Sequence, residues 1–207
     1  MACYLLCIEN PAFNSSIHRL FGKTRGLEKE APEAMMQHEL TTLLGLLDLM
    51  GEFELKMAEL YRTCAELWLE DEQFWRDMER AETKHAGIVS RIKKIVSEKP
   101  DRFTLGRLFK VPAVQTMMSG IQWNIQRLRK REITEQNMLF IARDLERSIL
   151  ENNYAQMIQS DGSGFQALMN EIVSDTVDHH EYLIQKISEI SLATPSTAEN
   201  HSKRQRR

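Results

Sequence analysis

The chain has 207 residues, of which 42% are hydrophobic and 28% are charged, and it contains only 9 Gly and 5 Pro. This composition suits one compact domain with long helices and few turns. The net charge of −3 and the pI near 6.1 do not favour nucleic acid or a membrane surface as the main partner, because neither polyanion would attract the chain as a whole. No segment approaches the ~20 consecutive apolar residues of a membrane span.

The N-terminal residues do not resemble an export signal. The apolar stretch 3–8 is shorter than the core of a secretory signal and lacks a basic start and a small-residue cleavage site, so we expect a cytoplasmic protein. The three cysteines, Cys3, Cys7 and Cys64, exclude a complete disulfide framework, and there is no pair of Cys-x-x-Cys motifs to hold a metal in sulfur. Cys3 and Cys7 could pair or bind a metal, but we interpret them as small apolar residues of an arm.

The first half of the chain predicts an arm followed by a helical hairpin. Residues 1–35 mix Asn, Pro, Ser, Gly and charge without a period, which indicates a flexible arm. From about 36 to 70 apolar residues recur at helical spacing. The acidic residues 70–72 then break the pattern and suit the start of a second helix, which should end near Pro100.

The second half predicts a crossover and a second hairpin. Residues 98–133 form a connection that contains a short helix at 121–131. The connection is long enough to pass along the whole length of a bundle helix, which is roughly 37 Å. A third helix should begin at 134–135 and run to about 159, and a turn at 161–164 leads to a fourth, about 165–190. We therefore expect an all-α four-helix bundle over 36–191, made of two hairpins and one crossover, and a disordered basic tail at 192–207.

The second helix carries two polar residues on its apolar seam. Glu82 and His85 are separated by three positions, so they are neighbours on one helix face, as two ligands of one metal cluster must be. Burying an unpaired carboxylate costs several kcal/mol, roughly, unless a cation or a donor compensates it. The rest of the seam is apolar: Trp75, Met78, Val89, Ile92 and Val96.

The other three helices show related anomalies. Glu54 falls on the apolar line of the first helix, Glu146 on that of the third and His179 on that of the fourth. A phase error of one residue would instead expose Glu54, and Glu146 could pair on a helix surface with neighbouring arginines. Three residues before His179 stands Thr176 instead of an acid, so Asp175 is the nearest carboxylate that could serve as a ligand.

This pattern resembles the rubrerythrin branch of the ferritin-like di-iron carboxylate proteins, over roughly residues 36–190. Members of that family carry a Glu on the first helix, Glu-x-x-His on the second, a Glu on the third and Glu-x-x-His on the fourth. Glu54 with Tyr61 seven residues later, and Glu82-Thr-Lys-His85, match the first half of the pattern. The stretch from Ala142 to Leu150 resembles the third helix, whereas the fourth departs at Thr176.

The resemblance implies a di-iron centre that reduces peroxide or oxidises ferrous iron. Glu82 and Glu146 would bridge the ions, with His85 and His179 as terminal ligands, and Thr176 leaves the second ion position one carboxylate short. Electrons for peroxide would come from a separate donor, and we expect a homo-oligomer. The second hypothesis is a degenerate bundle without metal that serves as an interaction or scaffold protein, with its long crossover and basic tail contacting partners. Under either hypothesis we expect Tyr61 to pack with its hydroxyl hydrogen-bonded instead of taking part in redox chemistry.

Overall fold

The computed structural model describes residues 27–106, 111–151 and 156–193, and the side chains of 37–106, 111–151 and 156–192. Its described part is all-α apart from one short pair of strands. The helices are α2 (Leu27–Leu67), α3 (Glu72–Glu98), α4 (Val111–Arg129), α5 (Glu135–Glu151) and α6 (Ser163–Ala193). Residues from 42 onward form one compact unit, and the chain up to Thr41 forms another. No described helix has a stretch long and apolar enough to cross a membrane.

The α2–α3 hairpin follows the predicted apolar seams. In the compact unit, α2 buries Leu43, Leu47, Met50 and Tyr61. A three-residue 3-10 helix (Leu69–Asp71) makes the turn, so α3 begins within the acidic segment that was predicted to start it. The buried face of α3 contains every residue of the predicted seam, and burial of such a stripe is what stabilises a helix of this length in a protein.

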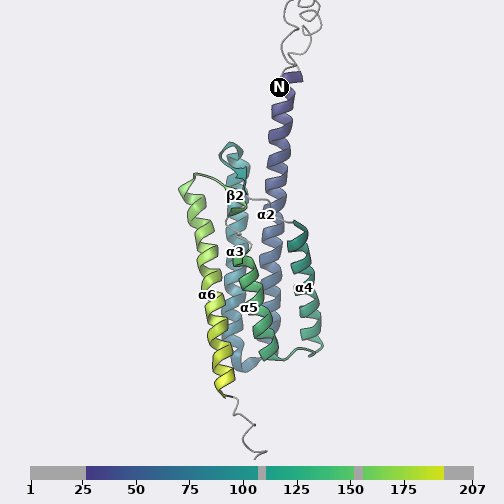
Figure 1. The fold of residues 1–207 in the computed structure, drawn as a ribbon, viewed down its shortest axis with the longest axis vertical. Coiled ribbons are helices and arrows are strands. Elements are labelled where there is room, and N and C mark those ends of the chain that lie inside the picture. Colours follow the sequence, from purple (N-terminus) through teal and green to yellow (C-terminus); the bar gives the residue numbers. More distant parts are fainter. Residues whose placement is uncertain (1–26, 107–110, 152–155, 194–207) are drawn as a thin grey trace, which may run out of the picture. The chain divides into compact units, whose positions relative to one another are not determined.

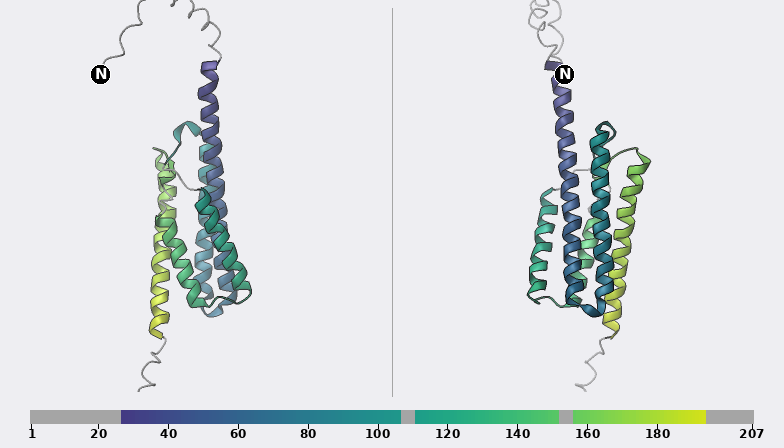
Figure 2. Two further views of the ribbon diagram at one scale, coloured as in Figure 1. Left: turned by 45° about the vertical axis from the view of Figure 1, so that its right-hand side comes forward. Right: turned by 180° about the vertical axis from the view of Figure 1, so that it is seen from behind.

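Four helices contact one another in turn around this core (Figures 1 and 2). The ion pair between Lys93 and Asp48 joins α3 to α2, and α6 packs against both α3 and α5. The hydrogen bond from Tyr61 to Glu146 joins α2 to α5. Each helix therefore presents one face to a shared interior, where polar side chains from different helices can meet.

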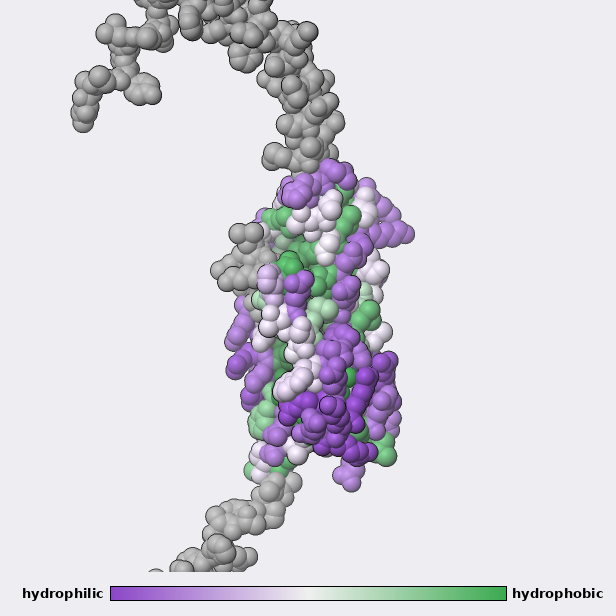
Figure 3. All heavy atoms as spheres, turned by 90° about the vertical axis from the view of Figure 1, so that its right-hand side faces the viewer, coloured by the Kyte–Doolittle hydropathy of each residue, from purple (hydrophilic) through white to green (hydrophobic). Residues whose placement is uncertain are grey.

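Helix α4 lies against the outer side of the compact part of α2, on the side away from α6 (Figure 2). Lys56 of α2 donates to Gln122 at 2.9 Å, and Arg129 pairs with Glu59 at 3.0 Å. The opposite face of α4 is exposed, and Figure 3 shows that hydrophilic residues dominate the lower part of this face, toward the C-terminal end of α4. The helix buries one apolar stripe: Val114, Ile121, Ile125 and Leu128.

A two-stranded antiparallel ladder joins the start of the crossover to the α5–α6 connection. Strand β1 (Thr104–Leu105) pairs with β2 (Ile158–Gln159), and the Gly106 amide continues the ladder by donating to the Met157 carbonyl at 2.8 Å. Gly106 is required there, because a Cβ at this position would lie 2.0 Å from the carbonyl oxygen of Gln156. The ladder therefore depends on a close backbone approach.

Several predicted boundaries were wrong. The third helix ends at Glu151 instead of about 159, because the backbone of Ile158 is engaged in the ladder. The crossover helix covers 19 residues instead of 121–131, since Pro112 falls in its first turn, where a missing N–H costs little. Helix α2 begins at Leu27, inside the expected arm. Residues 1–26 and 194–207, with Cys3, Cys7 and most of the expected tail, lie outside the described residues.

The ladder can be tested with two glycine substitutions. Gly106→Ala should lower the free energy of unfolding by about 1–3 kcal/mol, because the new Cβ must displace the Gln156 carbonyl. Gly120→Ala is the matched control, since no atom lies within 4 Å of the Cβ position in the middle of α4. It should raise stability by about 0.5–1 kcal/mol. Urea denaturation measures both, and a Gly106→Ala chain as stable as the parent would contradict the ladder.

Candidate metal centre

Five of the six residues proposed as ligands are buried together in the interior. Each is at most 6% exposed: Glu54, Glu82, His85, Glu146 and His179. They come from all four helices that enclose the core. The alternatives that placed Glu54 or Glu146 on a helix surface were therefore wrong, because the predicted helical phase is the correct one.

Glu82 lies between the two histidines. Its Oε2 is 3.3 Å from Nδ1 of His85, and its Oε1 is 3.0 Å from Nδ1 of His179. The centroids of the two imidazole rings are 5.7 Å apart. Each oxygen of the Glu82 carboxylate therefore faces a different histidine.

A second carboxylate joins each histidine. Glu54 Oε2 is 3.9 Å from Nδ1 of His85, and Glu146 Oε1 is 3.7 Å from Nδ1 of His179. Within the described part of the chain these residues make two possible metal-binding groups, Glu54–Glu82–His85 and Glu82–Glu146–His179. Glu82 belongs to both groups, whereas Glu146 belongs to one.

The spacing of these atoms fits ligands of a common ion. Nitrogen and oxygen ligands lie about 2.0–2.2 Å from a divalent transition metal, so two ligands of one ion are separated by roughly 3–4 Å. The four nitrogen–oxygen distances at the centre, from 3.0 to 3.9 Å, fall in this range. One imidazole and two carboxylates for each ion is also a donor set that suits iron, manganese or zinc.

Three buried atoms at the centre have no hydrogen-bond partner: Glu82 Oε1, Glu146 Oε2 and His179 Nδ1. Although Glu82 Oε1 and His179 Nδ1 are 3.0 Å apart, they are not aligned for a hydrogen bond. Buried polar atoms in proteins are normally paired, so each such exception requires a reason. A cation held between these atoms would satisfy all three.

Asp175 takes a different position from the one predicted. Its Oδ2 is 3.2 Å from Nε2 of His85, on the opposite edge of the ring from Glu82, and it belongs to neither group. Lys84 donates to the same oxygen at 3.0 Å. A histidine that donates its Nε2–H to a carboxylate keeps the lone pair of Nδ1 for a metal. Asp175 is thus placed to orient His85 instead of serving as a ligand.

Thr176 does not replace the missing acid. Its side chain is buried, and its hydroxyl donates to the Ile172 carbonyl of the same helix at 2.8 Å. A threonine bonded to its own helix in this way has its proton engaged and is a poor metal ligand. Helix α6 therefore contributes one residue, His179, to the two possible metal-binding groups.

Tyr61 holds Glu146 in place through a hydrogen bond. Its hydroxyl donates to Glu146 Oε1 at 2.6 Å, and its ring stacks on Trp75 with centroids 5.9 Å apart. The predicted packing and hydrogen bonding of Tyr61 are confirmed. Sequence reasoning missed Lys84, which carries no signal of its own because its partner Asp175 is 91 positions away.

The charges of the buried groups depend on one another. Burial lowers the pKa of His179, but Glu146 and Glu82 outweigh this effect and raise the pKa to about 10. Burial also acts to raise the pKa of Glu82, but the two histidines bring it below its ordinary value. The pKa of Glu146 is raised by burial and by the charge of Glu82. Without metal, protonated imidazole therefore supplies the positive charge that the carboxylates require.

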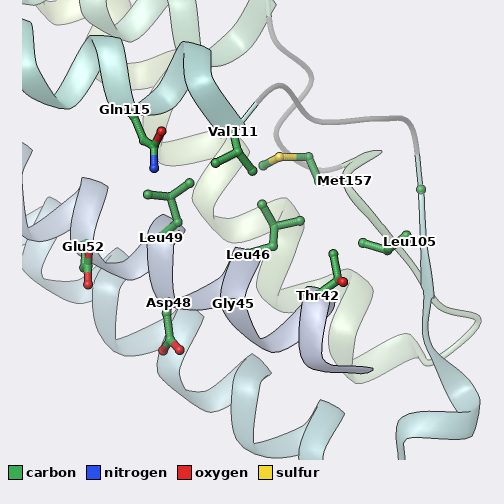
Figure 4. Close-up of a pocket in the computed structure, with 11 residues that line it drawn as sticks. Thr42, Gly45, Leu46, Asp48, Leu49, Glu52, Leu105, Val111, Gln115 and Met157 are labelled. Atoms are coloured by element: carbon green, nitrogen blue, oxygen red, sulfur yellow. The ribbon is translucent and has the colours of Figure 1, made fainter. Parts of the chain in front are cut away.

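A pocket on another side of the protein does not reach this centre. It has a volume of about 410 Å³, and Figure 4 shows residues of α2, including Leu46 and Leu49, facing Val111, Gln115, Leu105 and Met157 across it. Its lining is mainly apolar and contains none of the five buried candidate ligands. Among the described residues, the groups that could bind a metal therefore lie in the interior between the four helices.

Comparisons of the chain with protein-family models, with curated proteins and with solved structures found no match. Fold and site together define an all-α protein with buried Glu/His groups that could bind a metal.

The metal-free protein should lose stability as the pH rises. The pKa of His179 is about 10 in the folded chain, against an ordinary value of 6.5, so its contribution is complete below pH 6.5 and disappears as the pH rises through about 10. The free energy of unfolding with EDTA present should fall by about 1–3 kcal/mol across this range, and His179→Gln should remove that part of the slope. His180→Gln, a neighbour outside both groups, is the control and should keep the parental slope.

Proposed function

We propose that this protein is a ferritin-like bundle that holds two iron ions and uses them to reduce peroxide or to oxidise ferrous iron. The proposal joins the observed all-α fold to the rubrerythrin-like order of ligands along the chain: Glu54 on α2, Glu82 and His85 on α3, Glu146 on α5 and His179 on α6. Helices α2, α3, α5 and α6 form the four-helix bundle, and α4 is the helix of the crossover.

The shared position of Glu82 is the observation that carries this proposal. One buried carboxylate with each oxygen directed at a different histidine divides the centre into two halves of the same composition, each completed by a second glutamate. A structural ion pair would need only one partner. Two adjacent positions with a common carboxylate are the arrangement that a two-ion centre uses.

Iron bound here would supply electrons and open coordination positions for peroxide or dioxygen. The protein side chains prepare that chemistry in other ways. Asp175 holds His85 in the tautomer that presents Nδ1, and Tyr61 fixes one oxygen of Glu146. Met50 and Met57, one helical turn before and after Glu54 in α2, are almost completely buried, so this part of the helix is shielded from water.

The metal-free scaffold hypothesis has one observation in its favour. Thr176 stands where a fourth glutamate would complete the set, and its hydroxyl is bonded to its own helix. The protonated histidines could then balance three buried carboxylates permanently. Measurement of bound metal separates the two hypotheses directly.

Anaerobic iron loading provides that measurement. The parent chain should bind between one and two ferrous ions per chain, and Glu82→Ala should bind fewer than about 0.3, because the substitution removes the ligand that both groups share. Glu66→Ala, which removes an exposed carboxylate of α2, should match the parent. Iron is counted after desalting. A Glu82→Ala chain that retains the parental iron content, or a parent that binds none, would contradict the proposal.

Restoring the missing carboxylate tests the second ion position. Two ferrous ions carry four positive charges, whereas three glutamates supply three negative ones. Thr176→Glu adds a carboxylate one turn before His179, in the spacing that relates Glu82 to His85. The iron content should rise toward two per chain, with about tenfold tighter binding of the second ion and faster consumption of peroxide or dioxygen. If Thr176→Glu only destabilises the metal-free chain, the scaffold hypothesis gains support.

A further inference from the structure

A second pocket, distinct from the one in Figure 4, opens between α3 and α6. Its volume is about 510 Å³, and it is open to solvent on one side. Phe74, Met78 and Ala81 of α3 form one wall, and Tyr182 of α6 lies opposite. Its remaining lining residues are acidic or histidine: Asp77, Asp175, Asp178 and His179.

The pocket leads from solvent to the candidate metal centre. Asp77, Asp178 and Tyr182 are exposed, whereas Met78 and His179 are buried. His179 is only 6% exposed, and its Nδ1, which lacks a hydrogen-bond partner, lies beside Glu82 and Glu146. A ligand in this pocket therefore meets His179, which also belongs to the candidate metal centre.

The charge of the lining selects what can pass. Three carboxylates and no lysine or arginine line the pocket. Arg80 pairs with Asp77, and Lys84 pairs with Asp175, while no ion pair among the described residues includes Asp178. With Asp77 and Asp175 paired to cations, Asp178 is the carboxylate of the lining that remains to attract a cation, and a local charge of this kind speeds the arrival of the opposite ion.

We propose that the pocket between α3 and α6 is the port through which divalent cations reach the buried centre, with Asp178 as the receiving carboxylate and His179 as the first ligand met. This inference rests on the proposed metal-binding function. It assigns a role to Asp178, which is not one of the candidate ligands. It also identifies hydrated divalent cations, in addition to peroxide or dioxygen, as species that enter the site. Asp175 also lines the pocket, but it is already engaged with His85 and Lys84.

The port is tested by the rate at which the metal-free, full-length chain takes up Co²⁺, followed by stopped-flow absorbance of the visible Co²⁺ bands. Ala81→Phe places a bulky ring in the pocket and should slow uptake by about tenfold or more, with an unchanged final amplitude. Thr83→Phe, at an exposed position of α3 outside the lining, should bind at the parental rate. An Ala81→Phe chain that takes up Co²⁺ as fast as the parent would overturn the port.

A charge substitution tests the same port without changing its shape. Asp178→Asn should slow uptake about two- to fivefold at low salt, and the difference should shrink as the salt concentration rises. Glu189→Gln removes an exposed charge eleven positions further along α6, roughly 16 Å away, and should have no effect. Equal effects of the two substitutions would show that only the overall charge matters and would reject Asp178 as the receiving group.

The outcomes also separate the port from the function on which it rests. A parent chain with no Co²⁺ bands contradicts metal binding itself, and the port with it. A parent that binds Co²⁺, together with Ala81→Phe and Asp178→Asn chains that bind at the parental rate, leaves the metal centre intact and contradicts the port alone. If Ala81→Phe does not fold, the salt-dependent rate of Asp178→Asn still decides the question, because this exposed position tolerates the change.

Discussion

The rest of the structure depends on the burial of three carboxylates at one place in the core. Glu54, Glu82 and Glu146 are almost completely shielded from solvent. Negative charges buried close together repel one another strongly, because the dielectric constant of the protein interior is low. Their burial is tolerable only when positive charge is present among them. Two protonated histidines provide it without metal, and the Tyr61 hydroxyl adds a hydrogen bond to Glu146; a pair of divalent cations would provide the charge more fully. Folding and protonation are therefore linked at a single centre.

The two halves of this centre face different surroundings. His85 is held from outside by Asp175, which is itself held by Lys84, and Lys84 also pairs with Glu171. These contacts fix the orientation of one imidazole ring. Asp175 and His179 both border the pocket between α3 and α6. The two histidines of the centre therefore differ in their outer partners, because a carboxylate orients His85 whereas His179 borders the pocket itself.

The peripheral elements stabilise the helices that carry the ligands. Helix α4 covers the outer side of α2 through buried aliphatic residues and through the ion pair between Arg129 and Glu59. The β1–β2 ladder ties the end of the α3 region to the α5–α6 connection, so both hairpins are fastened near the same end. Such support matters because the side chains of a site must keep their separations to within a few tenths of an ångström. A side chain on a loosely held helix would not keep its distance from the side chains on the other helices.

The sequence by itself determined which residues would be buried together and where a ligand is missing. Helical periodicity is local, so the apolar seam of α3 is enough to place Glu82 and His85 on its inner face, and the same reasoning places Glu54, Glu146, Thr176 and His179. Only the tertiary structure decided what each polar atom faces. Adjacent positions on a helix differ by about 100° in direction, and the packing of α6 on α3 therefore turned Asp175 to the outer edge of His85 while Thr176 faced inward. The contact of Asp175 with Lys84 and the close approach at Gly106 join distant parts of the chain, and no local pattern encodes them.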